Sequence, residues 1–183
     1  MSRTPVLAFC GSLRAESLNR KLAHAVMRLE APDLTFHEVS IANLPLYNQD
    51  FEDAPPPPVA DFRSAIKLSD AILIISPEYN RSMPGVLKNA IDVGSRPMGF
   101  NTWKHKPTGI FGASPGAIGT AAMQQHLRPV LAAVNAPVMA EAEVYLTVKD
   151  GFFTDGGDLN DGTKKFLQGW MNDFSAFVKR HQA

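Results

Sequence analysis

The feature of this sequence that most restricts its fold is an alternation between short apolar runs and amphipathic segments of helical length. Runs of strand length occupy residues 6–10, 34–41, 71–76, 107–114 and 136–146. Segments with apolar residues at helical spacing follow them in turn, at 18–30, 59–69, 84–94, 119–135 and 162–180. Strands that alternate with helices in this way predict a parallel sheet with helices on both faces.

Two of the apolar runs also indicate where their strands lie in the sheet. The run "AILIIS" at 71–76 is the most apolar and predicts the central strand. The run "LTFHEVSI" at 34–41 alternates between apolar and polar residues and is typical of a strand nearer an edge. Five strands fit a flavodoxin-like, doubly wound α/β sheet of order 2-1-3-4-5 better than a barrel of eight repeats.

Two prolines mark expected features of the helices. Pro84 is expected in the first turn of the helix at 84–94, where its missing N–H costs nothing. Pro129 lies inside the segment 119–135 and is expected to kink or split that helix.

The length and the loops predict a single domain over residues 1–183. A chain of 183 residues has the size of one ordinary domain, and no domain boundary is visible. The segment 42–58 carries four consecutive prolines and predicts a stiff surface loop. The segment 149–161 is rich in Gly and Asp and is expected to be mobile.

Composition excludes several classes of protein. Lys plus Arg and Asp plus Glu are each 18, which argues against a nucleic-acid or anionic-membrane partner. Cys10 is the only cysteine, so neither an intrachain disulfide nor a cysteine zinc site can form. We find no metal-ligand spacing among the histidines, no signal-peptide pattern and no apolar run near the ~20 residues that span a bilayer. A cytoplasmic protein is expected.

The first strand is followed by "GSLRAESLNR", which predicts a monophosphate site. Ligands of doubly wound sheets bind at the carboxyl ends of the strands, and a helix that starts near Leu18 presents backbone N–H groups there. Ser12 and Ser17 add hydroxyls, Asn19 an amide and Arg14 a planar cation. A helix cap at Ser17 is the alternative interpretation, but it explains Ser17 alone.

Other phosphate sites do not fit the spacing. The sequence has no G-x-x-x-x-G-K-[ST] loop, and no G-x-G-x-x-G follows the first strand. A cysteine phosphatase loop that begins at Cys10 would need an arginine at position 16, which is Glu16. Cys10 is therefore interpreted as a small core residue.

Two further strand ends carry residues suited to a planar ring. After 71–76 come Pro77, Glu78, Tyr79 and Asn80, whose backbone could contact the edge of a heteroaromatic ring. The segment "GASPGAIGT" at 112–120 has three glycines that would let a ligand approach the backbone closely. The alternative is that Tyr79 is a packing residue, Asn80 a turn residue and the glycines a flexible bend.

Four segments together resemble the NADPH-dependent FMN reductase family, which includes quinone, azo-dye and chromate reductases. They are "GSLRAESLNRKL", "LPLYNQD", "SPEYNRSMPGVLKNAIDVGSRP" and "FGASPGAIGT". The resemblance implies a flavodoxin-like fold, an FMN cofactor, and NADPH or NADH as co-substrate. It also implies a small-molecule electron acceptor: a quinone, an azo compound, a free flavin or a metal oxyanion.

The resemblance also implies the cofactor-binding residues, position by position. Those expected near the phosphate are Ser12, Arg14, Ser17, Leu18 and Asn19. Those expected at the isoalloxazine ring are Pro77, Glu78, Tyr79, Asn80 and Ser82. Those expected at its other edge or at the ribityl chain are Gly112, Ala113, Ser114 and Gly116. Since the flavin N5 would carry the chemistry, no catalytic side chain and no metal ligand is expected.

Two positions depart from the family pattern. Glu16 stands where a small residue is usual, and we expect its carboxylate to turn outward, with Arg20 or Lys21 in reach. Val93 stands where an aromatic residue is frequent, at a position that concerns helix packing or subunit contact. A homodimer or homotetramer is expected. The alternative functions are a flavodoxin-type electron carrier and a flavin-fold regulatory protein without NAD(P)H turnover.

Overall fold

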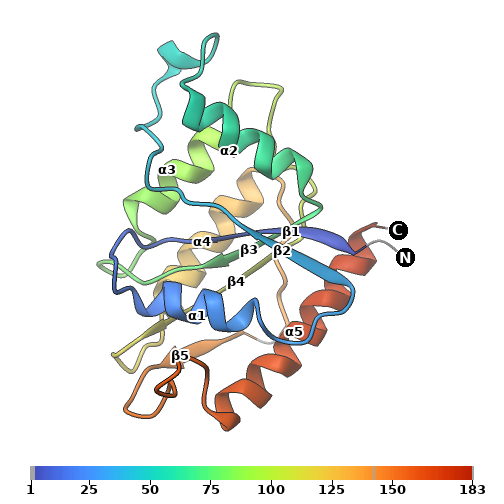
Figure 1. Ribbon diagram of the computed structural model, residues 1–183. Coiled ribbons are helices and arrows are strands. Elements are labelled where there is room, and N and C mark those ends of the chain that lie inside the picture. Colours follow the sequence, from blue (N-terminus) through green and yellow to red (C-terminus); the bar gives the residue numbers. More distant parts are fainter. Residues whose placement is uncertain (1–2, 142, 183) are drawn as a thin grey trace.

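Five parallel strands form one sheet in the order β2-β1-β3-β4-β5 (Figure 1). This arrangement comes from a computed structural model that describes residues 3–141 and 143–182. The strands are β1 (Thr4–Cys10), β2 (Leu34–Glu38), β3 (Ala71–Ile75), β4 (Thr108–Ser114) and β5 (Tyr145–Thr147). The predicted flavodoxin-like order is confirmed, with β3 at the centre and β2 at an edge.

Helices cover both faces of this sheet (Figure 1). They are α1 (Leu18–Val26), α2 (Pro57–Leu68), α3 (Gly85–Gly94), α4 (Ala121–Ala133) and α5 (Asp161–Gln182), with a short 3₁₀ turn at Gln49–Phe51. One core cluster joins the sheet to α1 and α5, and a second joins it to α2, α3 and α4.

The strand β3 shows why the central runs are apolar throughout. Leu73 and Ile75 point into the cluster under α1 and α5, whereas Ile72 and Ile74 point into the cluster under α2 to α4. All of β3 is buried. Because each fully buried side chain of this type contributes about 1.5–3 kcal/mol, a polar residue at any of these positions would be costly.

The fifth strand is shorter than predicted and is interrupted. The chain first pairs with β4 through a parallel bridge between Val138 and Thr108, and pairs with it again where Tyr145 faces Gly112. From Thr108 to Gly112 is four positions along β4, whereas from Val138 to Tyr145 is seven positions along the facing segment. The excess residues leave the ladder, so the predicted strand at 136–146 becomes the bridge at Val138 and then β5.

Two predictions about helices differ in part from the structure. Of the kink or split expected at Pro129, the split does not occur, because α4 continues to Ala133. Proline removes only the bond to the carbonyl of Gln125, and Gln125 is exposed, so water can satisfy that group. The helix predicted at 18–30 ends at Val26, and the N–H groups of Arg28 and Leu29 bond three residues back, the latter to Val26 O at 3.0 Å.

Smaller differences concern the prolines at two helix starts. Pro84 precedes α3 as its N-cap, rather than lying in its first turn. The predicted surface loop at 42–58 gives way to α2 already at Pro57, because proline fits the first helical position.

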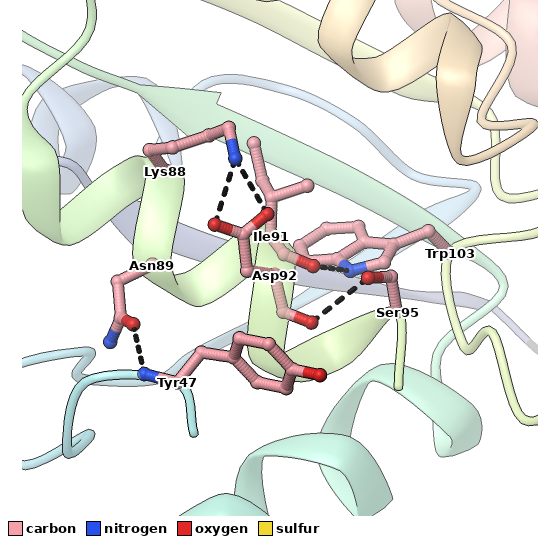
Figure 2. A network of polar contacts seen from close by, with 7 residues as sticks. All are labelled: Tyr47, Lys88, Asn89, Ile91, Asp92, Ser95 and Trp103. Carbon is pink, nitrogen blue, oxygen red and sulfur yellow. Dashed lines mark hydrogen bonds and ion pairs between the residues drawn. The ribbon is translucent and has the colours of Figure 1, made fainter. Parts of the chain in front are cut away.

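The end of α3 fixes the two loops beside it (Figure 2). Asn89 accepts a hydrogen bond from Tyr47 N at 2.8 Å and donates one to Pro45 O at 2.9 Å. Trp103 is fully buried and donates from its indole nitrogen to Ile91 O at 3.0 Å. The loops before α2 and before β4 are therefore both anchored on α3.

Within residues 3–141 and 143–182, no helix has the length and apolarity needed to cross a bilayer. The same residues contain no cluster of three or more His, Cys, Asp or Glu side chains placed to hold a metal ion.

Candidate functional site

Three strand ends meet around Ser76 at the carboxyl edge of the sheet. A Cβ on Gly11 would lie 2.2 Å from Ser76 Oγ, and one on Gly112 would lie 1.9 Å from Ser76 O. No side chain fits at either position. The loops that leave β1, β3 and β4 therefore emerge side by side from this edge.

The loop after β1 presents serine hydroxyls at the start of α1. Ser17 is the N-cap of α1, and its Oγ accepts a hydrogen bond from Arg20 N at 3.3 Å. Ser12 Oγ accepts one from Arg14 N at 3.4 Å. Both serines are buried, whereas Arg14 is exposed above them. Because the cap uses only the oxygen of Ser17, its hydroxyl can still donate to an anion at the helix start.

Asn19 joins this loop to the end of β4. Its Nδ2 donates to Ala113 O at 2.9 Å, and its Oδ1 accepts from Ala113 N at 2.8 Å. Both ends of the carboxamide are engaged by the backbone. Asn19 therefore positions α1 against β4, and the phosphate contact expected of it from the sequence stays a prediction.

Glu16 turns outward, as predicted. Its side chain is 73% exposed, and its Oε2 lies 3.0 Å from Lys21 Nζ. The hydrogen bond from Lys21 lowers the pKa of Glu16, which keeps the carboxylate ionised and paired away from the loop. Arg20, the other expected partner, instead donates from Nη2 to Ser12 O at 3.2 Å and braces the loop.

Cys10 lies buried at the end of β1, and burial raises the pKa of its thiol. A thiol of raised pKa stays protonated at neutral pH and is a poor nucleophile. This environment supports the interpretation of Cys10 as a core residue.

The loop after β3 ends in a tight turn from Tyr79 to Ser82. Tyr79 N donates to Ser82 O at 2.9 Å, and Ser82 N donates to Tyr79 O at 3.0 Å. Asn80 and Arg81 between them have φ angles of 51° and 64°, in the left-handed region. Asn80 is thus the turn residue of the alternative interpretation, while Tyr79 is 49% exposed rather than packed.

Two side chains of this loop bind it to α4. Glu78 Oε2 accepts a hydrogen bond from Met123 N at 3.1 Å, in the first turn of α4. Thr120, the N-cap of α4, forms no side-chain cap, so Glu78 supplies it from outside the helix. Ser82 Oγ lies 2.7 Å from His126 Nδ1, one helical turn further on. Pro77 precedes this pair of contacts at the end of β3.

The three glycines at the end of β4 and in the loop after it serve mainly the protein's own packing. Besides Gly112, a Cβ on Gly119 would lie 2.7 Å from the backbone of Tyr145. Gly116 differs, because its Cβ would meet only Ser114 Oγ at 3.5 Å. Ser114 Oγ also accepts a hydrogen bond from Gly116 N at 3.0 Å. Of the three glycines expected to admit a ligand, Gly116 alone has that space.

The predicted site residues thus lie at three adjacent strand ends: in the loops after β1, β3 and β4, in the first turn of α1, and in the last residues of β4. These residues have two kinds of placement. Those that turn toward the protein are Asn19, Glu78 and Ser82. Those exposed at the rim are Arg14, Tyr79, Asn80 and Gly116. Sequence analysis missed the contacts of Arg20 and His126, and no local pattern could have revealed them. The set offers hydroxyls, a helix start and a guanidinium at one end, and backbone at the other.

Such a donor set fits a phosphate joined to a flat ring. Glu16 is paired outside the first loop and Glu78 is bonded to Met123, so neither carboxylate opposes an anion there. The loops after β3 and β4 would take the ring between an exposed tyrosine and open backbone.

The sequence matches the NADPH-dependent FMN reductase family over residues 4–150. It is 47% identical to a quinone reductase of Pseudomonas putida over 179 residues, which cover 97% of this chain and 96% of that protein. It is 44% identical to a 2-hydroxy-1,4-benzoquinone reductase of a Burkholderia species over 92% of this chain and 93% of that one.

A solved structure has the same fold with high similarity. FerB, a flavoenzyme NAD(P)H:(acceptor) oxidoreductase from Paracoccus denitrificans, superposes with a TM-score of 0.93 at 41% identity. The match covers 97% of this chain and 98% of FerB.

Proposed function

The chain belongs to the NADPH-dependent FMN reductase family, and from this premise we propose that it is an FMN-dependent oxidoreductase that uses NADPH or NADH. Bound FMN would supply the redox chemistry between the nicotinamide nucleotide, as hydride donor, and a second substrate, as electron acceptor. The protein supplies binding, orientation and charge stabilisation.

The loop after β1 is the proposed phosphate site. Ser12, Ser17 and the N–H groups at Leu18 surround the start of α1, and Arg14 supplies a planar cation. Arg20 supports this loop through Ser12 O. The observation that carries the proposal is this single phosphate site, from which Glu16 is turned away.

The loops after β3 and β4 are the proposed ring site. Pro77, Tyr79 and Asn80 would contact the ring from one loop, while Ser114 and Gly116 would contact it from the other. The backbone N–H groups of such loops stabilise negative charge that develops on a ring they face. Asn19 and Glu78 act here by holding the loops in place.

A quinone is the proposed electron acceptor. Two of the relatives named above are quinone reductases, and the exposed Tyr79 leaves an open aromatic face at the rim for a second flat molecule. Azo compounds, free flavins and metal oxyanions are the alternative acceptors, because they too can take up electrons from a reduced flavin.

Binding and turnover together test this function. Equilibrium titration with FMN, FAD and riboflavin should give tightest binding for FMN, because one phosphate site has no place for a diphosphate. Initial rates with NADPH, NADH and a series of quinones should then give the parallel double-reciprocal lines of a ping-pong reaction. Tight FMN binding without any NAD(P)H turnover would instead identify an electron carrier.

The oligomeric state and the cellular location of the protein stay predictions. We expect a homodimer or homotetramer that works in the cytoplasm, where reduced nicotinamide nucleotides are available. Equal numbers of basic and acidic residues give no reason to expect a nucleic-acid partner.

A further inference from the structure

A basic cavity lies at the opposite end of the sheet from the loops after β1, β3 and β4, where FMN is proposed to bind. It has a volume of about 590 Å³, within the range of roughly 300–1,000 Å³ that holds small organic ligands. The second half of α2 forms one wall and the loop at 96–106 forms the other. This loop leads into the amino end of β4, and the seven residues of β4 separate it from the flavin site by about 20 Å.

The lining of this cavity concentrates positive charge in a protein without net charge. Its cationic members are Arg63, Lys67, Arg96, Lys104 and Lys106. Among the described residues that line it, none carries a carboxylate. Two carboxylates outside the lining have an electrostatic effect on these cations: Glu52 partly offsets the lowering of the Arg63 pKa by burial, and Asp70 does the same for the pKa of Lys106. A concave surface of one charge sign attracts and holds ions of the other.

Two of these cations are fixed by backbone carbonyls rather than by carboxylates. Arg63 Nε donates to Val93 O at 2.8 Å, and Lys106 Nζ donates to Ser69 O at the end of α2. Burial lowers the pKa of both groups. An anion that arrives from solution would stabilise a partly buried cation whose hydrogen bonds go only to backbone carbonyls.

The loop that forms the second wall is rigidly attached to α3 (Figure 2). Trp103 donates to Ile91 O at 3.0 Å, and Thr102 Oγ1 donates to Gly94 O at 2.6 Å. A Cβ on Gly94 would lie 2.5 Å from the indole nitrogen of Trp103, so the helix end and the loop fit together closely. A wall held in this way loses little freedom when a ligand binds.

One aromatic side chain stands exposed within the lining. Phe100 is 70% exposed and shares the loop with Arg96 and Lys104. A flat ring can stack on its face, and the exposed ammonium groups of Lys67 and Lys104 can pair with phosphate oxygens.

We propose that this basic cavity is a nucleotide site separate from the proposed FMN site. The cations of α2 and of the loop at 96–106 would hold the phosphates, and the base would stack on Phe100. The cavity is several times larger than a lone phosphate needs, which favours a phosphate that carries a ring. The site goes beyond the proposed reaction, because the strands separate it from the flavin loops of the same chain.

Calorimetric titration of FMN-loaded protein with ADP tests this proposal, since FMN then occupies its own site. Lys67→Glu and Lys104→Glu reverse exposed cations of the cavity, and Lys165→Glu reverses an exposed cation on α5 as the matched control. We expect each cavity variant to weaken ADP binding about tenfold or more, and the control to stay within about twofold. Added salt should weaken binding to the wild type.

Pyrophosphate and adenosine separate the two parts of the ligand. The proposal requires that pyrophosphate binds and that adenosine alone binds more weakly than ADP. It is overturned if ADP does not bind, if adenosine binds as well as ADP, or if all three variants bind ADP equally. Titration of the same variants with FMN should give unchanged affinity, which shows that the fold and the flavin site are intact.

Discussion

Arg14 is exposed at the rim of the loop after β1, whereas the hydroxyls of Ser12 and Ser17 lie buried beneath it. The guanidinium is the one full positive charge that this loop itself offers to a phosphate. A charged hydrogen bond of this kind contributes about 1.5–3 kcal/mol, and exposure places Arg14 toward the lower value.

Arg14→Ala should therefore weaken FMN binding about tenfold. Arg180→Ala, which removes an exposed guanidinium from α5, is the matched control, and Cys10→Ala should act only through packing. Fluorescence titration with FMN measures all three. Equal affinities for Arg14→Ala and Arg180→Ala would contradict the phosphate role of Arg14.

Glu16 offers a second test at the same loop. Because its carboxylate pairs with Lys21 outside the loop, Glu16→Gln should change FMN affinity by no more than about twofold, at low and at moderate salt. Glu16→Ala should behave in the same way. A large, salt-sensitive gain in affinity would show that the carboxylate faces the phosphate.

At the scale of the elements, α4 depends on a carboxylate from another part of the chain. The Glu78 side chain is only 8% exposed and bonds to Met123 N, so its loss leaves an uncapped helix start. Glu78→Ala should lower the free energy of unfolding by about 1–2 kcal/mol, and Glu78→Gln, which keeps an acceptor, should lower it less.

Urea unfolding of these variants checks this role, with Glu30→Ala as the control at an exposed position after α1. The control should stay within about 0.5 kcal/mol of the wild type. If Glu78→Ala is as stable as Glu30→Ala, the carboxylate does not support α4.

The meeting of three strand ends around Ser76 is the second feature at this scale. Gly112→Ala places a methyl group 1.9 Å from Ser76 O, so the ends of β3 and β4 must separate. We expect a loss of stability of about 1–3 kcal/mol together with weaker FMN binding.

Gly116→Ala is the matched variant in the loop that follows β4, since its Cβ meets only Ser114 Oγ at 3.5 Å. Thermal unfolding should leave this variant close to the wild type. Comparable losses in both variants would mean that the loop, rather than the contact with Ser76, sets the stability.

At the scale of the whole molecule, the sheet could be predicted because its strands are sorted by burial. The run at 71–76 is apolar at every position because β3 contributes side chains to both cores. The run at 34–41 alternates because β2 lies at the edge. The placing of the site followed from the same rule, since parallel strands bring their carboxyl ends to one edge.

The contacts that organise the site could not be predicted, because they join residues far apart in sequence. Asn19 meets Ala113 across 94 positions, Glu78 meets Met123 across 45, and Ser82 meets His126 across 44. Spacing within a helix or a strand carries no information about such pairs. The interruption before β5 could not be predicted for the same reason, since it depends on how this segment pairs with β4.

The central claim is that this protein binds FMN and carries electrons through it from a nicotinamide nucleotide to an acceptor. The most direct measurement follows the visible absorbance of the FMN-loaded protein without air. NADPH or NADH should bleach the flavin band, and a quinone added after the nucleotide is consumed should restore it. Protein that remains colourless after incubation with FMN, or a flavin band that neither nucleotide bleaches, would contradict the account.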